Sequence, residues 1–151
     1  MKKTTIILLL IISAVNAMSQ TYIYRGNSTY TSDILYTWDG EYLYSGKSTY
    51  TSDIILRFNG VKVFKGRSSY SSDILYTWNG RNLFRRQSTY TSDILFTSDG
   101  KYIYSGNSTF DSDILYTIVG KYIYSGRSTY SKDILYTMDA PVPRPVLLSI
   151  L

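Results

Sequence analysis

The chain has 151 residues, of which 44% are hydrophobic and 16% aromatic, with 17 Tyr but no Cys and no His. This composition excludes disulfide bonds, catalytic triads built on His, and zinc sites built on Cys and His. The formal net charge is +5, and Lys2 and Lys3 contribute two of these charges, which leaves +3 for the rest of the chain. Such a mild positive charge does not favour a nucleic acid as the partner.

The N-terminus has the pattern of a secretory signal peptide over residues 1–17. Lys2 and Lys3 precede an unbroken aliphatic run at residues 6–12, and small residues lead to Ala17. The run is too short to cross a membrane, which takes about 20 apolar residues. We therefore expect a secreted protein (extracellular, periplasmic or at the cell surface) with no integral membrane segment after cleavage. A short lead, residues 18–21, follows.

Residues 22–141 consist of six consecutive units of 20 residues without an insertion. A fixed period of this length indicates a repeat architecture. One Ser column and one Asp column never change, and we interpret both as structural turn residues, because Asp readily accepts backbone N–H groups in its own turn. These residues are Ser28, Asp33, Ser48, Asp53, Ser68, Asp73, Ser88, Asp93, Ser108, Asp113, Ser128 and Asp133.

A calcium site is the alternative interpretation of the Asp column. Calcium loops concentrate several oxygen ligands within a short span, whereas only one Asp recurs in each copy. We therefore expect no metal and no cofactor.

Each copy contains two segments rich in β-branched and aromatic residues, such as ILYTW and YLYS, separated by a turn sequence. In the first copy the turn is Asp39-Gly40, a strong signal for a two-residue hairpin. A turn centred on these two residues places Tyr36 opposite Leu43. Ile34 would then share one face of the hairpin with both of them.

Both faces of such a hairpin are apolar, so one copy cannot bury its own surface. The sequence thus predicts an all-β protein whose six β-hairpin repeats stack as an elongated β-solenoid-like array. A closed ring of hairpins is the alternative, because residues 22–24 and 134–138 form complementary half-hairpins at the two ends. The apolar tail at residues 142–151 contains Pro and is predicted to cap the last copy or to donate a strand to a neighbour.

The motif STYTSD, at Ser28 to Asp33, resembles short Tyr-rich repeats of small secreted bacterial proteins whose function is unassigned. In period and hairpin content, the array is also similar to the choline-binding repeats of bacterial surface proteins, which bind choline in aromatic cages between hairpins. Those repeats rely on recurrent Trp, whereas Trp occurs here only at Trp38 and Trp78. The second resemblance therefore implies an architecture and no binding residues.

These features predict a non-enzymatic protein of the cell surface with a structural or adhesive role. Its open ends suggest that it self-assembles head to tail, so its first predicted partner is a second copy of itself. The alternative is a module that binds a cell-surface polysaccharide through exposed aromatic rings. Candidates are Tyr22, Tyr42, Tyr102, Tyr122, Trp38 and Trp78. The four Tyr residues are included because their column tolerates polar residues in other copies. Ice binding through the Thr-x-Thr motifs is a more remote alternative.

Basic residues cluster in the middle of the chain, and such a patch can attract anionic polymers. We interpret them as a solvated rim of variable repeat positions, because other copies have different residues there. They are Lys62, Lys65, Arg67, Arg81, Arg85 and Arg86.

Overall fold

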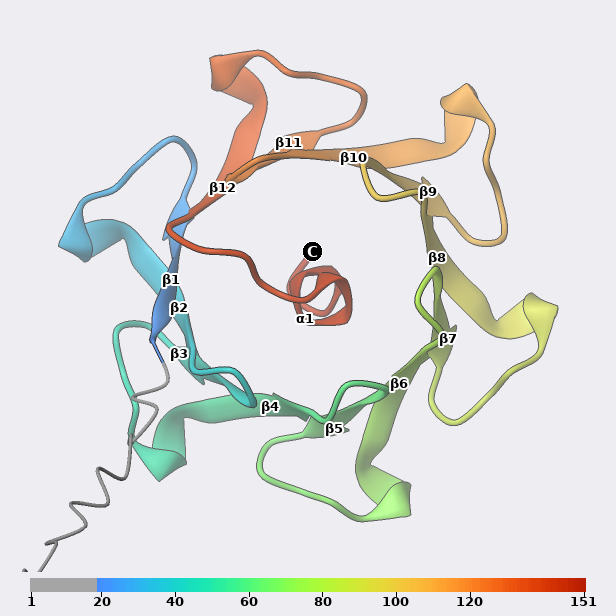
Figure 1. The fold of residues 1–151 in the computed structure, drawn as a ribbon, viewed down its shortest axis with the longest axis horizontal. Coiled ribbons are helices and arrows are strands. Elements are labelled where there is room, and N and C mark those ends of the chain that lie inside the picture. Colours follow the sequence, from blue (N-terminus) through green and yellow to red (C-terminus); the bar gives the residue numbers. More distant parts are fainter. Residues whose placement is uncertain (1–18) are drawn as a thin grey trace, which may run out of the picture.

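The computed structural model describes residues 19–151 as a closed ring of twelve antiparallel strands (Figure 1). The predicted signal peptide, residues 1–17, lies outside the described residues. Within residues 19–151, no helix has the length and apolar character needed to cross a membrane. The strands are β1 (Thr21–Arg25), β2 (Ile34–Trp38), β3 (Tyr42–Ser45), β4 (Ile54–Phe58), β5 (Lys62–Lys65), β6 (Ile74–Trp78), β7 (Asn82–Arg85), β8 (Ile94–Ser98), β9 (Tyr102–Ser105), β10 (Ile114–Val119), β11 (Tyr122–Ser125) and β12 (Ile134–Met138).

The ring closes because the first strand, β1, pairs with the last strand, β12, with Ile23 opposite Met138. The Asp139 backbone N–H donates to the carbonyl of Tyr22 (3.2 Å), and the Tyr22 N–H donates to Asp139 Oδ1 (2.8 Å). In the first complete hairpin, Asp39 makes the same two contacts with Tyr42. The sixth hairpin is therefore assembled from the two ends of the chain.

This closure corrects the predicted elongated β-solenoid-like array, which is wrong. The strands are all β and pair as repeated hairpins, but they form the closed ring that the sequence allowed as the alternative. The likeness to stacked choline-binding hairpins fails for the same reason. An open array would leave two unpaired strand edges, and pairing β1 with β12 removes both of them within one molecule.

The hairpin turns have a different register from the predicted one. Asp39 N–H donates to the carbonyl of Tyr42 (3.2 Å), so the two central residues are Gly40 and Glu41. Gly40 has a φ of +104°, which a residue without a Cβ adopts at little cost. The Asp39 side chain accepts the N–H groups of Glu41 and Tyr42 at 2.9 and 2.7 Å. Asp therefore stabilises the turn from the position before its centre.

The shifted turn changes which residues face each other across the hairpin. Leu43 lies opposite Trp38, and Tyr36 lies opposite Ser45, so the predicted pair of Tyr36 with Leu43 is wrong. Ile34 pairs with Tyr24 of β1 beyond an irregularity in the ladder, and so it does not continue the inner row of Tyr36 and Trp38.

The inner face of the ring is the hydrophobic core. One aliphatic position in each odd-numbered strand is completely buried, at 0% exposure, namely Ile23, Leu43, Val63, Leu83, Ile103 and Ile123. Large side chains of the even-numbered strands, including Trp38, Phe58 and Met138, pack against this set.

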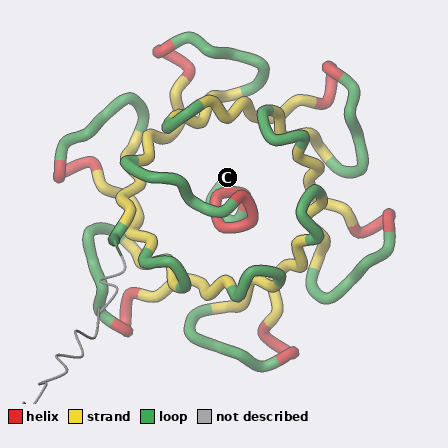
Figure 2. The backbone as a smooth tube through the Cα atoms, viewed as in Figure 1, coloured by secondary structure: helices red, strands yellow, loops and turns green. Residues whose placement is uncertain are grey.

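A short helix fills the centre of the ring. Figures 1 and 2 show the chain turning inward after β12, so that the strands surround α1 (Arg144–Leu148). Val146 and Leu147 in this helix are 0% exposed. Eight strands make a barrel just wide enough for its own side chains to fill, so a ring of twelve needs additional material inside. The tail thus lies inside the ring instead of covering the end of a stack.

We expect Leu147→Ala to lower the free energy of unfolding by about 2–5 kcal/mol, because it leaves a cavity in the centre of the ring. Denaturant unfolding of the purified protein measures this loss. The matched control is Leu115→Ala, at a side chain that is 38% exposed, where the loss should stay below about 1 kcal/mol. Equal losses in the two variants would show that the helix contributes no more to stability than the ring surface does.

Candidate functional site: the petals and the clefts between them

Six loops project outward from the ring, and we call them petals (Figure 2). Each petal connects an odd-numbered strand to the next even-numbered strand and contains one turn of 3-10 helix. The petals are residues 26–33, 46–53, 66–73, 86–93, 106–113 and 126–133. Their helical turns are η1 (Thr31–Asp33), η2 (Thr51–Asp53), η3 (Ser71–Asp73), η4 (Thr91–Asp93), η5 (Asp111–Asp113) and η6 (Ser131–Asp133).

The invariant Ser and Asp fix the shape of each petal. In the first petal, the Ser28 hydroxyl donates to Asp33 Oδ2 (2.5 Å) and accepts the N–H of Tyr30 (3.1 Å). The Asp33 N–H donates to the carbonyl of Tyr30 (2.9 Å). The same Ser–Asp hydrogen bond, at 2.5–2.6 Å, recurs as Ser48–Asp53, Ser68–Asp73, Ser88–Asp93, Ser108–Asp113 and Ser128–Asp133.

The Asp side chain thus has the Ser hydroxyl as its partner, where the sequence suggested a backbone N–H. Residues 19–151 contain no group of three or more acidic side chains close enough together to hold a metal ion.

Between Ser and Asp, each petal presents one aromatic ring to solvent. These six side chains are 71–76% exposed, and they are Tyr30, Tyr50, Tyr70, Tyr90, Phe110 and Tyr130. Sequence reasoning did not select them as ligand-facing residues. Their signal was nevertheless present, since an aromatic residue recurs in every copy within a Ser- and Thr-rich segment that lies outside both strands.

The aromatic residues selected from the sequence do not gather on one surface. Tyr22, Tyr42, Tyr102 and Tyr122 are half-buried, and each packs edge-on against the tyrosine two residues later, with ring centroids 6.0–6.5 Å apart. Trp38 is only 4% exposed and belongs to the core. Trp78 is half-buried and lines a cleft with Arg81 and Arg144.

A second aromatic column supports the hairpin turns. The Tyr44 hydroxyl donates to Asp39 Oδ2 (2.8 Å), and burial together with this hydrogen bond raises the pKa of Tyr44 to about 12. Tyr104 and Asp99 form the same pair at 2.8 Å. Where the turn residue is an Asn, the aromatic residue five positions later is a Phe, which has no hydroxyl; the pairs are Asn59–Phe64 and Asn79–Phe84. These tyrosines are therefore structural.

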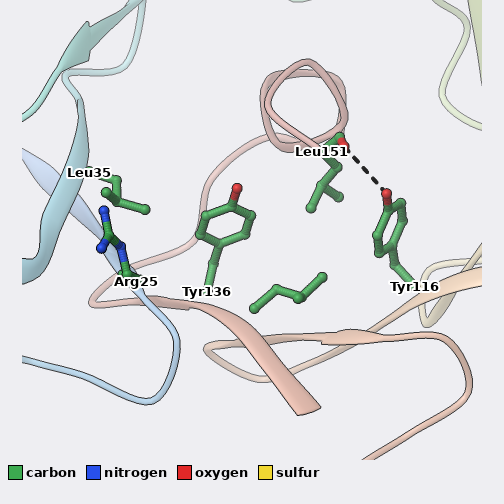
Figure 3. Close-up of a pocket in the computed structure, with 6 residues that line it drawn as sticks. Arg25, Leu35, Tyr116, Tyr136 and Leu151 are labelled. Carbon is green, nitrogen blue, oxygen red and sulfur yellow. Dashed lines mark hydrogen bonds between the residues drawn. The ribbon is translucent and has the colours of Figure 1, made fainter.

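One open end of the ring carries a depression of about 370 Å³ beside the C-terminal segment (Figure 3). Arg25, Leu35 and Tyr136 line it, and the Tyr116 hydroxyl donates to the carbonyl of Leu151 (3.3 Å). The Tyr136 hydroxyl donates to the carbonyl of Ile150 (3.4 Å). Both hydroxyls therefore hold the chain's own tail.

Another cleft, of about 410 Å³, lies between the third and fourth petals. Its lining includes Lys65 at the end of β5, Ser72 and Asp73 from the third petal, and Arg85 and Arg86 where β7 enters the fourth petal. Three cationic side chains line this cleft, against two in the cleft at Trp78 and one in the depression beside Leu151.

Residues 23–151 match the family model described as 6-fold beta flower protein. The chain belongs to this family. The matched segment includes all six petals of the flower and the helix at its centre. Searches of curated proteins and of solved structures found no match. The family description agrees with a protein built from 20-residue repeats, and it names no activity.

We expect Ser68→Ala to destabilise the third petal, because it removes the hydrogen bond to Asp73 and the one from the Tyr70 N–H. The free energy of unfolding should fall by about 1–2 kcal/mol, and hydrogen exchange at the Tyr70 amide should accelerate. The adjacent exposed serine provides the control, Ser69→Ala, which should change neither quantity appreciably. Unchanged exchange at Tyr70 in Ser68→Ala would contradict the structural role of the Ser–Asp pair.

The raised pKa of Tyr44 predicts a loss of stability at alkaline pH. A tyrosine with a pKa of about 12 in the folded state, against 10.0 when unfolded, stabilises the fold fully below pH 10. This contribution disappears as the pH rises towards 12. Carbon-13 NMR of labelled tyrosine rings, with the Tyr44 signal assigned through Tyr44→Phe, measures the titration. Asp39→Asn should lower the midpoint towards 10, and a wild-type midpoint already near 10 would contradict the argument.

Proposed function

We propose that this protein is a secreted, non-enzymatic adhesive protein that binds a repetitive polysaccharide of the cell surface. The observation that supports the proposal is the set of six petal aromatics, each 71–76% exposed at an equivalent place around the ring. Aromatic side chains are enriched at interaction surfaces, and every copy keeps one here outside the core. The flat, amphipathic face of a Tyr ring suits contact with a sugar.

The symmetry of the petals favours a polymer over a small ligand. Each petal offers a single exposed ring, which supports only weak binding alone. A polymer that engages several petals together gains effective concentration, which can raise the overall affinity by about 10²–10⁴-fold without any new contact. A repeated ligand is therefore the partner that best uses a repeated site.

The other predicted roles fit the ring less well. Head-to-tail assembly relied on free end strands, and β1 and β12 pair with each other within the molecule. Catalysis has little chemical basis, since the chain has no His or Cys and its recurrent Asp residues accept hydrogen bonds from Ser in every petal.

The test is to replace all six petal aromatics by Ala and to measure retention on immobilised polysaccharides. Because these rings lie outside the core, the variant should keep the thermal unfolding midpoint within a few degrees. We expect its polymer affinity to fall by about 100-fold or more, and each single replacement to have a much smaller effect.

A second variant separates the petal aromatics from those selected from the sequence. In it, Tyr22, Tyr42, Tyr102 and Tyr122 are replaced by Asn, the residue that the fourth copy has at this position, so that their aromatic rings are removed. This variant should bind as the wild type does. If the wild type binds no member of a diverse polysaccharide panel, or if the six-Ala variant binds as well as the wild type, the proposal fails.

A further inference from the structure

The basic cleft between the third and fourth petals differs from the corresponding places in the other copies. Lys65, Arg85 and Arg86 are all exposed and line a single cleft of about 410 Å³. The sequence predicted that the central basic residues form a solvated rim of variable positions. The structure instead brings three of them together at the ends of β5 and β7, the two strands that flank β6.

The positive charge of the cleft is not neutralised by neighbouring carboxylates. Across residues 19–151, the ion pairs are Arg57–Glu41 and Arg127–Asp111, and both lie elsewhere. The acidic residue in the lining is Asp73, whose Oδ2 accepts the Ser68 hydroxyl at 2.6 Å. Three cations therefore face one carboxylate that already has a hydrogen-bond partner.

Arg86 occupies a backbone position that disfavours any side chain. Its φ is +52°, in the left-handed region, and it is the one residue other than Gly with a positive φ in the described part of the chain. The other five copies have Gly at this position, with φ between +55° and +63°; these are Gly26, Gly46, Gly66, Gly106 and Gly126.

The backbone of Arg86 makes the contacts that Gly makes in other copies. Its N–H donates to the carbonyl of Leu75 (2.8 Å), and its carbonyl accepts the Thr77 hydroxyl (2.7 Å). Gly46 does the same with Leu35 and Thr37, at 2.7 Å in both cases. The side chain of Arg86 is thus an addition that the turn does not need, and residues held in unfavourable backbone conformations often serve function.

We propose that this cleft binds the anionic group, a sulfate or a carboxylate, of an acidic polysaccharide. The guanidinium groups of Arg85 and Arg86 present planar donor pairs that match the oxygens of either anion. Tyr70 and Tyr90, the exposed rings of the two petals beside the cleft, are available to contact the attached sugars. The inference deepens the proposed function, on which it rests for the identity of the polymer.

The decisive variant is Arg85→Ser with Arg86→Gly, which restores residues that other copies have at these positions. It should fold normally, and its thermal midpoint should be unchanged or higher, because Gly relieves the backbone strain at position 86. We expect its affinity for a sulfated or uronate disaccharide to fall about tenfold or more, because charge-assisted hydrogen bonds are lost.

The control removes two positive charges on other petals in the same manner. Lys47→Asn with Lys132→Ser also introduces residues found in other copies, and it has the same net charge as the decisive variant. It should bind the charged disaccharides within about twofold of the wild type. An equal loss in both variants would show that net charge alone drives the binding.

The probes are a sulfated disaccharide, a uronate disaccharide, their neutral counterpart and a short single-stranded DNA, titrated into labelled protein at low salt. Amide shifts at Ser72, Arg86 and Gln87 that appear only with the charged sugars, and weaken with added salt, support the proposal. No shift at these amides, equal binding by the neutral sugar, or tighter binding of the DNA overturns it.

The disaccharide titrations compare the wild type with the cleft and control variants alone, so their result does not depend on the polymer measurements. In one outcome, the six-Ala variant loses polymer binding while Arg85→Ser with Arg86→Gly leaves the affinity for both disaccharides unchanged. This result would reject the anion site in the cleft and leave the proposed polymer binding in place. Binding of a disaccharide at the cleft by a protein that retains no polymer would reject the proposed multivalent function and leave the anion site in place.

Discussion

The pairing of β1 with β12 is the interaction on which the rest of this structure depends. Thr137 and Gly26 form a hydrogen bond across this seam although they are 111 residues apart in the chain. The entropic cost of bringing distant segments together grows only with the logarithm of their separation. The seam uses the same contacts as the hairpins, with Asp139 acting on Tyr22 as Asp39 acts on Tyr42. Closure consequently needs no specialised element, and it creates the interior in which the core and α1 lie.

The central helix explains why one inner position of the repeat varies in size and polarity, whereas the Ser–Asp pair of the petals does not. A single helix has no six-fold symmetry, so equivalent strand positions around the ring meet different parts of it. The last position of the even-numbered strands accordingly changes in size and polarity. Trp38, Phe58, Trp78, Ser98 and Met138 are examples. The Ser–Asp pairs face local surroundings that are the same in every petal, and they never vary. The column that meets the helix and the columns that fix the petal are thus under different structural constraints.

The repeat, the β structure and the position of the hairpins could be predicted from the sequence, because they depend on local residue types. The choice between a stack and a ring could not, since it depends on the small rotation between successive hairpins, which no single residue encodes. The turn register failed for a local reason: Asp39 stabilises the turn through its side chain from outside the centre, and Gly40 takes the first central position.

The candidate site was predictable only in part. The sequence drew attention to aromatic rings and to the central basic residues, but burial decided which rings are accessible. Tyr42 and Trp38 belong to strands and pack against neighbours, whereas Tyr70 lies in a loop whose hydrogen bonds hold it away from the ring. Arg86 is visible in the sequence as the one break in a Gly column. Its proximity to Lys65 across a petal required the fold.

The fit of one helix inside one closed circuit has a consequence for how such a gene can evolve. Tandem arrays commonly lengthen or shorten by whole units, and an open stack tolerates this because each unit contacts only its neighbours. Here, a duplicated unit would widen the ring around a helix α1 of unchanged size. A deleted unit would make the ring too narrow for α1. Copy number is therefore constrained, and the surface of a unit changes by substitution, as Arg85 and Arg86 differ from the Ser and Gly of other copies.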